Sequence, residues 1–284
     1  MDDAQAVFET HRKLLFTLAY DMLGSVADAE DVVQDTWLRW VRVDLEQVRS
    51  PRSYLVRIAV RCSLERLRSL RAAREEYVGP WLPEPPAPDA GDPVADAESV
   101  TTGLLVVLET LSPLERAAFV LREAFGFEHA EIGRILDRSP AAVRQLTHRA
   151  REHVHARRPR FTADPAQARK VAERFVAAAL GGSLAELIEV LAPDVTLVND
   201  GGGRVRAALR PVSGAAKVGR LLARVGPRYA DLRVRWLPGD VPACLLVAGD
   251  GVRAALTLEP DASGTRIQQV YGLVNPDKLA HLGR

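Results

Sequence analysis

The chain has 284 residues, a formal net charge of +1, 47% hydrophobic residues and 26% charged residues. This length corresponds to about two or three domains, and the composition is that of chains that bury apolar cores, which excludes a disordered protein. Because the net charge is close to zero, binding to nucleic acid has to come from local basic patches. No apolar run reaches the length of a bilayer-spanning helix, and the first ten residues lack the pattern of a secretory signal.

Two cysteines, Cys62 and Cys244, lie far apart in apolar surroundings, without the spacing of metal ligands. This pattern predicts buried free thiols in a reducing compartment and no zinc site. We therefore expect a cytoplasmic protein that holds no metal ion and no cofactor.

Residues 4–74 have the pattern of three helices. Apolar positions from Val7 to Met22 repeat at helical spacing and end at Gly24. Ser25 is placed to cap a second helix, in whose first turns acidic residues are favoured by the helix dipole. Ser50 and Pro51 mark the start of a third helix, in which apolar positions alternate with arginines.

A proline-rich segment, Tyr77–Asp92, follows the three helices and has neither helical nor strand periodicity. It is typical of a linker that is extended where prolines cluster. Trp81 and Leu82 are unusual in a solvated tether, because an exposed tryptophan is uncommon. We expect these two residues to dock on a neighbouring domain.

Helical spacing resumes near Val94 and continues to about Arg158, where it ends in a helix-turn-helix pattern. The first helix of the pair is expected to have an apolar face made of Ala130, Ile132, Ile135 and Leu136. The turn is marked by Ser139, which is placed to cap the second helix, and by Pro140 in its first turn.

The second helix of the pair has two contrasting faces. Its apolar face comprises Val143, Leu146 and Ala150, and its opposite face comprises Arg144, Gln145, His148, Arg149 and Arg151. A helix of this kind, placed after a tight turn, suits the major groove of DNA, where arginines neutralise phosphates and reach base edges. The alternative is an ordinary helical hairpin with a solvated charged face.

Beyond Pro159 the pattern becomes α+β. Helical spacing covers 165–180 and 183–191, and strand-like alternation covers 194–198, 232–237, 244–248, 252–258 and 265–270. Asp250-Gly251 between two such runs predicts a hairpin. We expect a curved antiparallel sheet with helices, forming a cone-shaped α+β domain with an internal pocket.

The order of segments from Val7 to His155 closely resembles the extracytoplasmic-function (ECF) sigma factors of bacterial RNA polymerase. The resemblance rests on an acidic amphipathic helix, ADAEDVVQDTWLRW, an arginine-rich helix, SYLVRIAVRCSLERLR, and the basic helix-turn-helix downstream. It implies a multidomain protein with two all-α domains before the α+β tail. Its parts would be a region 2 domain in 1–75, a linker in 76–93, a region 4 helix-turn-helix domain in 94–160 and the tail in 164–284.

The resemblance also implies roles for individual residues. Those expected to bind core RNA polymerase are Asp28, Glu30, Asp31, Gln34, Asp35 and Trp37, because an acidic face with a projecting tryptophan suits a basic partner helix. Those expected to bind the minus-ten promoter element are Arg52, Ser53, Tyr54, Arg57, Arg61 and Arg68, with the loop 42–52 as the candidate pocket for an unstacked base. Those expected to bind the minus-thirty-five element are Ser139, Ala141, Arg144, Gln145, His148 and Arg149.

The tail resembles a SnoaL-like domain of the nuclear-transport-factor-2-like (NTF2-like) cone fold, which a subgroup of these sigma factors carries. Three motifs support that subgroup, and their residues are Trp81, Leu82 and Pro83 in the linker, Asp200, Gly201, Gly202 and Gly203 in the tail, and Asn275, Pro276, Asp277, Lys278 and Leu279 near the C-terminus. In the subgroup the domain replaces a separate anti-sigma protein and modulates activity in cis. The resemblance therefore implies a sigma factor, monomeric when free, that directs core RNA polymerase to specific promoters and is modulated by its own tail.

Two other functions remain open from the sequence. SnoaL-like domains include cyclases and isomerases that use a pocket carboxylate as general base, and the candidates here are Asp194, Asp200 and Asp240. The tail's histidine, His281, lies near the end of the chain, and no nucleophile–base spacing is visible, so we expect no catalysis and leave a small-molecule ligand open. The alternatives are a DNA-binding regulator fused to such an enzyme or ligand-binding domain, and a simple helix-turn-helix repressor.

Overall fold

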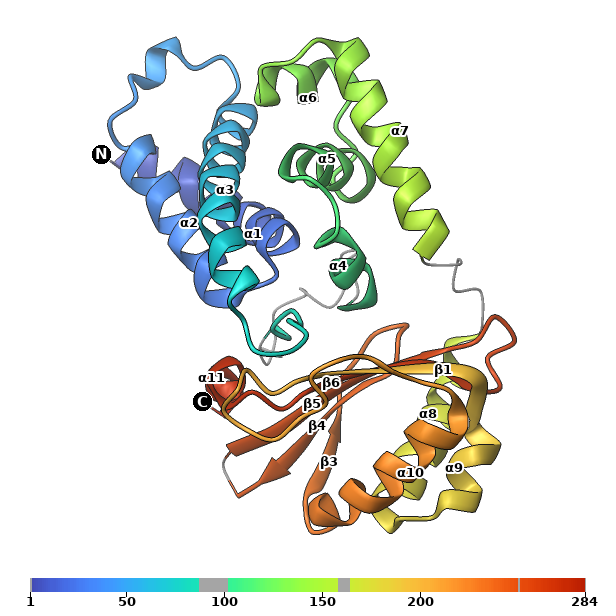
Figure 1. Cartoon of the computed structure of the whole chain (residues 1–284). Coiled ribbons are helices and arrows are strands. Elements are labelled where there is room, and N and C mark those ends of the chain that lie inside the picture. Colours follow the sequence, from blue (N-terminus) through green and yellow to red (C-terminus); the bar gives the residue numbers. More distant parts are fainter. Residues whose placement is uncertain (1, 87–101, 158–163, 250, 284) are drawn as a thin grey trace. The chain divides into compact units, whose positions relative to one another are not determined.

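The computed structural model describes residues 2–86, 102–157, 164–249 and 251–283, and these residues divide into two compact units (Figure 1). The described residues of the first unit are 2–76 and 104–157, and those of the second are 77–86, 102–103, 164–249 and 251–283. The first part of the linker, from Tyr77 to Pro86, therefore belongs to the second unit.

Three helices open the first unit: α1 (Asp2–Leu23), α2 (Val26–Trp40) and α3 (Pro51–Glu75), with a short 3-10 helix, η1 (Leu45–Gln47), before α3. The predicted caps are confirmed. The Ser25 side chain accepts a hydrogen bond from the Asp28 amide at 3.3 Å, and the Ser50 side chain accepts one from the Ser53 amide at 3.4 Å. Both caps satisfy amides that have no partner within the helix.

The second half of this unit comprises α4 (Thr102–Leu108) from Leu104 onward, α5 (Pro113–Phe119), a π-helical turn η3 (Val120–Ala124), α6 (His129–Leu136) and α7 (Pro140–Arg157). Ser139 caps α7 as predicted, accepting from the Ala142 amide at 3.2 Å. The prediction for Ala130 was wrong, because its side chain is exposed. Two helical residues turn the chain by about 200°, so Ala130 faces away from the buried Ile132.

One continuous core runs through both halves of the first unit. At its edge lies a group of charged side chains around Glu109, which pairs with both Arg74 of α3 and Arg116 of α5. Arg116, only 2% exposed, also donates to the Asp21 carbonyl at 3.1 Å, and Arg74 donates to the Leu23 carbonyl at 2.8 Å. Burial lowers the pKa of Arg74, and Glu109 opposes that shift. The two arginines thus satisfy carbonyls at the C-terminal end of α1 and join it to α3 and α5.

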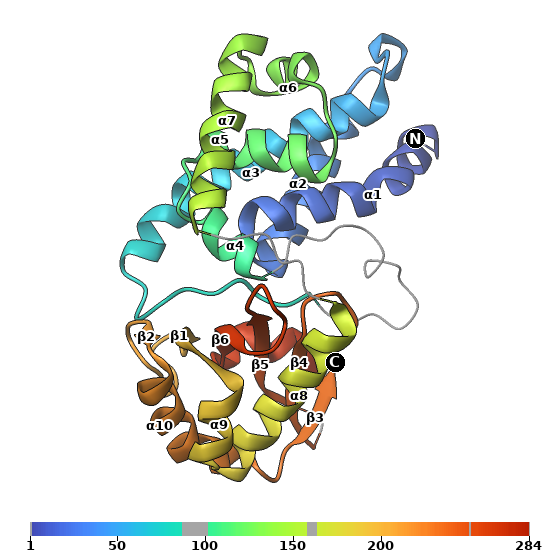
Figure 2. The same cartoon turned by 90° about the vertical axis from the view of Figure 1, so that its right-hand side faces the viewer.

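The second unit has three helices on one side of a six-stranded sheet (Figures 1 and 2). The helices are α8 (Pro165–Gly181), α9 (Leu184–Val190) and α10 (Ala215–Val225), and a short helix η4 (Gly226–Tyr229) follows α10. The strands are β1 (Leu191–Asp200), β2 (Val212–Ser213), β3 (Arg233–Trp236), β4 (Ala243–Ala248), β5 (Gly251–Pro260) and β6 (Ile267–Leu273). The chain continues through α11 (Pro276–Leu279) and η5 (Ala280–Gly283).

The sheet has the order β2-β1-β6-β5-β4-β3. The expectation of an antiparallel sheet was wrong at one pair, because β1 and β6 run parallel, with Leu197 beside Val270. After the intervening strands, β6 lies beside β1 and runs in the same direction. The alternation of residues within one strand does not reveal such a pairing. Helix α10 was also missed by the sequence analysis. The α+β fold class itself is confirmed.

We predict that Glu109→Ala destabilises the first unit by about 3 kcal/mol, because it leaves the buried Arg116 and the half-buried Arg74 without their shared carboxylate. Urea unfolding followed by circular dichroism measures the effect. The matched control is Glu65→Ala, which removes an ion pair to Arg39 whose side chains are 58% and 47% exposed and should cost less than about 1 kcal/mol. Equal effects of the two variants would contradict the structural role of Glu109.

Candidate functional site

The acidic face that the resemblance assigns to polymerase binding lies along α2. Its exposed side chains are those of Glu30, Asp31, Gln34 and Asp35. Asp28 is only 14% exposed, and its carboxylate lies 2.6 Å from Arg66 of α3. Arg66 also pairs with Asp31 at 3.1 Å. Asp28 therefore ties α2 to α3, and the exposed part of this face begins at Glu30.

The aromatic and apolar residues of α2 are arranged differently from the expectation. Trp37 does not project, because it is half-buried with its ring centroid 5.0 Å from that of Phe8. The exposed apolar side chains are Leu38 and Val41, at 49% and 42% exposure. Leu38 lies four residues after Gln34, and Val41 lies three residues after Leu38, so both lie on the same side of the helix as Gln34. Sequence analysis missed both, although this spacing could have revealed them.

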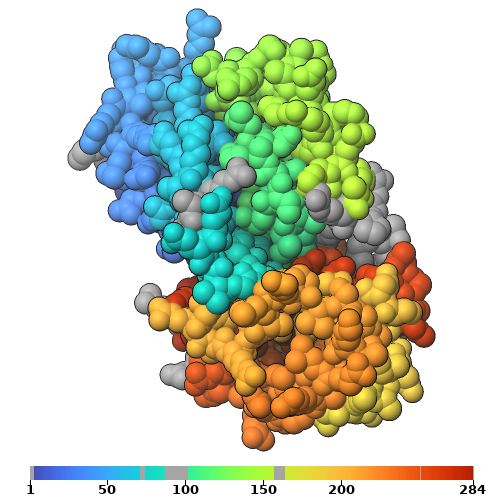
Figure 3. Space-filling view, viewed as in Figure 1, coloured from blue at the N-terminus to red at the C-terminus, as the bar shows by residue number. Residues whose placement is uncertain are grey.

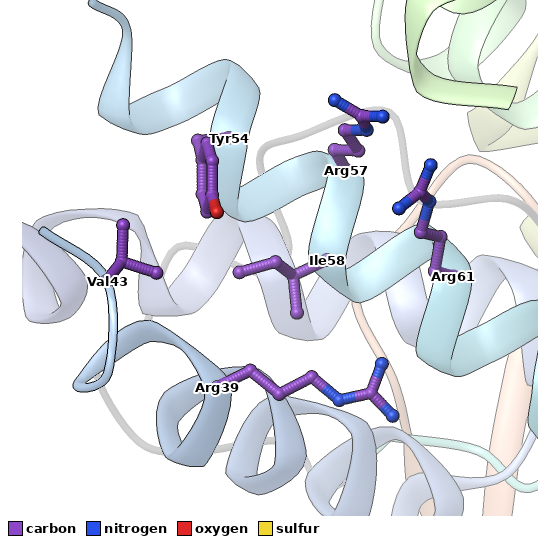
Figure 4. Close-up of a pocket in the computed structure, with 6 residues that line it drawn as sticks. All are labelled: Arg39, Val43, Tyr54, Arg57, Ile58 and Arg61. Atoms are coloured by element: carbon purple, nitrogen blue, oxygen red, sulfur yellow. The ribbon is translucent and has the colours of Figure 1, made fainter. Parts of the chain in front are cut away.

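A pocket of about 310 Å³ lies between the end of α2 and the first half of α3 (Figure 4). It is lined by Arg39, Val43, Tyr54, Arg57, Ile58 and Arg61. Figure 4 shows the apolar side chains at one end and the three guanidinium groups at the other. Three lining residues were expected minus-ten contacts, whereas the loop 42–52 contributes only Val43. An aromatic and aliphatic wall beside guanidinium groups can hold an unstacked base and its phosphate.

The charges around the pocket are unevenly compensated. Arg39 pairs with Glu65 at 3.0 Å, and this hydrogen bond raises the pKa of Arg39. Arg57 and Arg61 are exposed and form no recorded ion pair with any residue that the structure describes. The remaining expected contacts lie outside the pocket: Arg52, whose guanidinium sits 4.9 Å from the centre of the Phe127 ring, together with Ser53 and Arg68. Of the three arginines that line the pocket, Arg57 and Arg61 are therefore the two available to bind an anion.

All six residues expected to read the minus-thirty-five element are exposed, and five of them lie on α7 with Ser139 as its cap. The opposite side of α7 buries Val143, Leu146 and Ala150 as predicted. Arg149 pairs with Glu115 of α5 at 3.2 Å, so part of its charge is already compensated. The positions Ala141, Arg144, Gln145 and His148 form the outward face of the helix.

The linker is bound in the second unit by a pair of buried charges. The Leu82 amide donates to the Asp200 carboxylate at 2.8 Å, and the Leu82 carbonyl accepts from the Lys278 ammonium at 2.6 Å. Lys278 and Asp200 also pair with each other at 2.8 Å, and Leu82 is 1% exposed. The Lys278 ammonium lies 4.0 Å from the centre of the Trp81 ring. The pair therefore clamps the main chain of Leu82 while Trp81 covers the cation.

A second layer of contacts surrounds this clamp. Tyr77 donates to Asp200 at 2.5 Å and accepts from the Asn275 amide group at 2.9 Å. Gly202 has φ of +57°, and a Cβ there would lie 2.2 Å from the Asn275 side chain, so only glycine fits. Arg204 pairs with Asp277 at 2.9 Å, and His281 contacts the Pro85 carbonyl at 2.8 Å. The three sequence motifs thus meet, together with Tyr77, Arg204 and His281, which the sequence analysis missed.

The residues weighed as general bases are not grouped. Asp194 and Asp240 are exposed, and Asp200 is occupied by the linker. Within the described ranges there is no cluster of potential metal ligands, and no helix there is both long enough and apolar enough to cross a membrane. Both cysteines are buried free thiols as predicted, and burial raises the pKa of Cys244 to about 12.

Comparison with known proteins agrees with this geometry. Residues 7–73 match Sigma-70 region 2, and residues 103–154 match Sigma-70, region 4. The ECF RNA polymerase sigma factor SigJ of Mycobacterium tuberculosis is 38% identical, over 96% of this chain and 92% of that protein. The probable ECF RNA polymerase sigma factor SigI of the same species is 31% identical, over 98% and 95%. The crystal structure of SigJ matches with a TM-score of 0.76 and 34% identity, over 96% of this chain and 97% of that one.

The helical unit is therefore that of a sigma factor, with region 2 in α1–α3 and region 4 in the helices that follow. The whole chain belongs to the ECF RNA polymerase sigma factors. It binds core RNA polymerase and promoter DNA and directs the initiation of transcription.

We predict a pH dependence from Tyr77, whose pKa is raised, first by burial and then by the hydrogen bond to Asp200. In the unfolded chain the pKa of a tyrosine is about 10. The stabilisation by Tyr77 should be complete below that pH and should decrease as the pH rises above it, because only the unfolded chain then loses the proton. The free energy of unfolding of the wild type, minus that of Tyr77→Phe, should therefore shrink between pH 8 and pH 11. A constant difference would contradict the prediction.

Proposed function

We propose that the tail of this sigma factor restrains its activity in cis by holding the linker between regions 2 and 4. The observation that supports this most directly is the clamp of Asp200 and Lys278 on Leu82. The tail would act by contact and not by catalysis, since the carboxylate that resembles a buried general base is already engaged with the linker.

The arrangement of the helical unit gives the restraint a physical basis. The helix α3, with the minus-ten residues, packs against α5 and α6, so both DNA-reading surfaces belong to one compact unit. The two promoter elements are about 25 base pairs apart, or about 85 Å at 3.4 Å per base pair. Region 2 and region 4 must therefore separate to reach both. The linker joins them, so its capture in the tail adds to the free energy of that separation.

Specific roles follow for the surfaces in the helical unit. The α2 face of Glu30, Gln34, Asp35 and Leu38 would contact core polymerase, with Asp28 positioning it. The pocket beside Tyr54 would take an unstacked base of the minus-ten element, and the outward face of α7 would enter the major groove at the minus-thirty-five element. A monomer bound to polymerase is sufficient for these roles.

The pocket assignment predicts that Tyr54→Ala lowers run-off transcription about tenfold, because stacking on an aromatic ring contributes about 1–3 kcal/mol per base. Tyr54→Phe keeps the ring and should retain most of the output. A template that is already unpaired at the minus-ten element should reduce the defect of Tyr54→Ala. An equal loss with Tyr54→Phe would show that the hydroxyl or the fold, and not stacking, is responsible.

The tail assignment predicts that Lys278→Met and Trp81→Ala raise promoter-specific run-off transcription several-fold with core polymerase. Lys278→Met should also speed chymotrypsin cleavage after Tyr77 and Trp81, since it releases the linker. The matched control is Lys170→Met, which removes an exposed lysine of α8 in the tail and should change neither quantity. A chain ending near Arg160 gives the effect of removing the whole tail.

Two results would contradict the proposal. Faster cleavage of the linker with unchanged output would show that the linker is bound but does not restrain transcription. Lower output from both variants would show that the docked linker supports transcription.

A further inference from the structure

The second unit carries a strongly basic segment that the functions described so far do not use. Residues 201–230 contain seven arginine and lysine residues and no aspartate or glutamate, in a chain whose net charge is only +1. In the space-filling view this segment, coloured gold to orange, forms much of one face of the second unit (Figure 3). The charge is thus concentrated on one part of the tail.

Helix α10 arranges part of this charge in a row. Lys217, Arg220 and Arg224 are separated by three and four residues, so they share one side of the helix, and all three are exposed. The opposite side buries Val218 in the core. Arg228 in η4 is also exposed, four residues further on. We refer to these four residues as the α10 basic face.

The α10 basic face lacks the acidic partners that several other arginines of the chain have. Arg66, Arg149, Arg151 and Arg169 each have a carboxylate within 3.2 Å. For the four residues of the α10 basic face, no ion pair or hydrogen bond is recorded among the residues that the structure describes. Four neighbouring cations without acidic partners repel one another, so an external anion would be stabilised there.

The chemistry of the face favours the sugar-phosphate backbone of nucleic acid over a protein. Protein interfaces depend on buried aromatic or aliphatic anchors, and none of residues 212–230, all of them described, is an exposed large apolar side chain. The exposed apolar residues nearest in the sequence, Val205 and Leu209, precede α10, and the exposed Leu184 and Ile188 of α9 lie against Gly219 of α10. Arginine and lysine spaced by a rise of about 4.5 to 6 Å along a helix can meet successive phosphates. Residues 201–230 contain no asparagine or glutamine, so the contacts expected there are those of cations with phosphates, which carry no sequence information.

We infer that the α10 basic face binds the phosphate backbone of duplex DNA and adds a sequence-independent contact to those of regions 2 and 4. This surface is separate from the linker clamp and does not depend on the sign of the tail's control.

The test is the salt dependence of binding. The full chain is titrated onto a fluorescent duplex without promoter elements, at several NaCl concentrations, and the slope of log K against log [NaCl] is measured. Each phosphate contact contributes about 0.9 to that slope. The triple variant Lys217→Gln, Arg220→Gln, Arg224→Gln should therefore flatten the slope by about 2.7 if all three residues contact phosphates, and weaken binding at low salt.

The matched control neutralises three exposed cations elsewhere in the tail: Lys170→Gln, Arg253→Gln, Arg266→Gln. It changes the net charge equally and should leave the slope unchanged. Circular dichroism checks that both variants fold. An unchanged slope in the α10 variant, or the same change in both variants, would overturn the inference. An unchanged slope with weaker binding to core polymerase would assign the face to a protein partner instead.

A second measurement locates the contact. Both native cysteines are buried, so Arg220→Cys supplies an accessible thiol for attaching an iron chelate. Cleavage of the duplex backbone near this position in the complex with polymerase and promoter DNA is expected. Absence of cleavage, with normal cleavage from a chelate attached at Arg144→Cys in α7, would overturn the inference.

Discussion

The Asp200 carboxylate is the point at which three separate stretches of the chain meet. It accepts hydrogen bonds from Tyr77, from the Leu82 amide and from Lys278, besides one from the Gly202 amide in its own turn. A buried charge is tolerated only where it is paired and hydrogen-bonded, and removing one partner of such a pair is costly. The linker is therefore part of the tail's internal structure, because it supplies two of the donors that this carboxylate needs.

A comparable arrangement of buried charge holds the helical unit together. Glu109 lies between Arg74 and Arg116, and both arginines also bind carbonyls at the end of α1. The interaction joins helices of region 2 to a helix of region 4. In both units, then, a charged cluster binds segments that are distant in the sequence. Charged clusters specify such an arrangement strictly, since a displaced partner leaves an unsatisfied buried group.

Local signals predicted much of this structure. Ser25, Ser50 and Ser139 cap helices where the sequence placed them, since capping depends on residues within one turn. Docking of Trp81 and Leu82 was expected because a tryptophan is unusual in a linker. The partners of Leu82, Asp200 and Lys278, belong to motifs that the resemblance singled out. Tyr77, Arg204 and His281 gave no such signal, because their partners are 70 or more residues away in the sequence or are main-chain atoms.

Long-range pairing was the main limit. The parallel pairing of β1 with β6 joins residues that local alternation cannot connect. The pocket beside Tyr54 draws Arg39 from α2 as well as the expected residues of α3, because it forms only where the two helices meet. Helix α10 was missed, although Lys217, Arg220 and Arg224 have helical spacing.

The docked linker has a consequence for how such a protein can respond to a signal. Linker and tail are parts of one polypeptide, so they are always present in equal numbers, and their association is intramolecular. Its extent is set by an equilibrium within each molecule and does not change with the amount of protein in the cell. More synthesis of this chain would raise the docked and the undocked forms in the same proportion, so their ratio changes only when a ligand or partner binds one of the two forms more tightly.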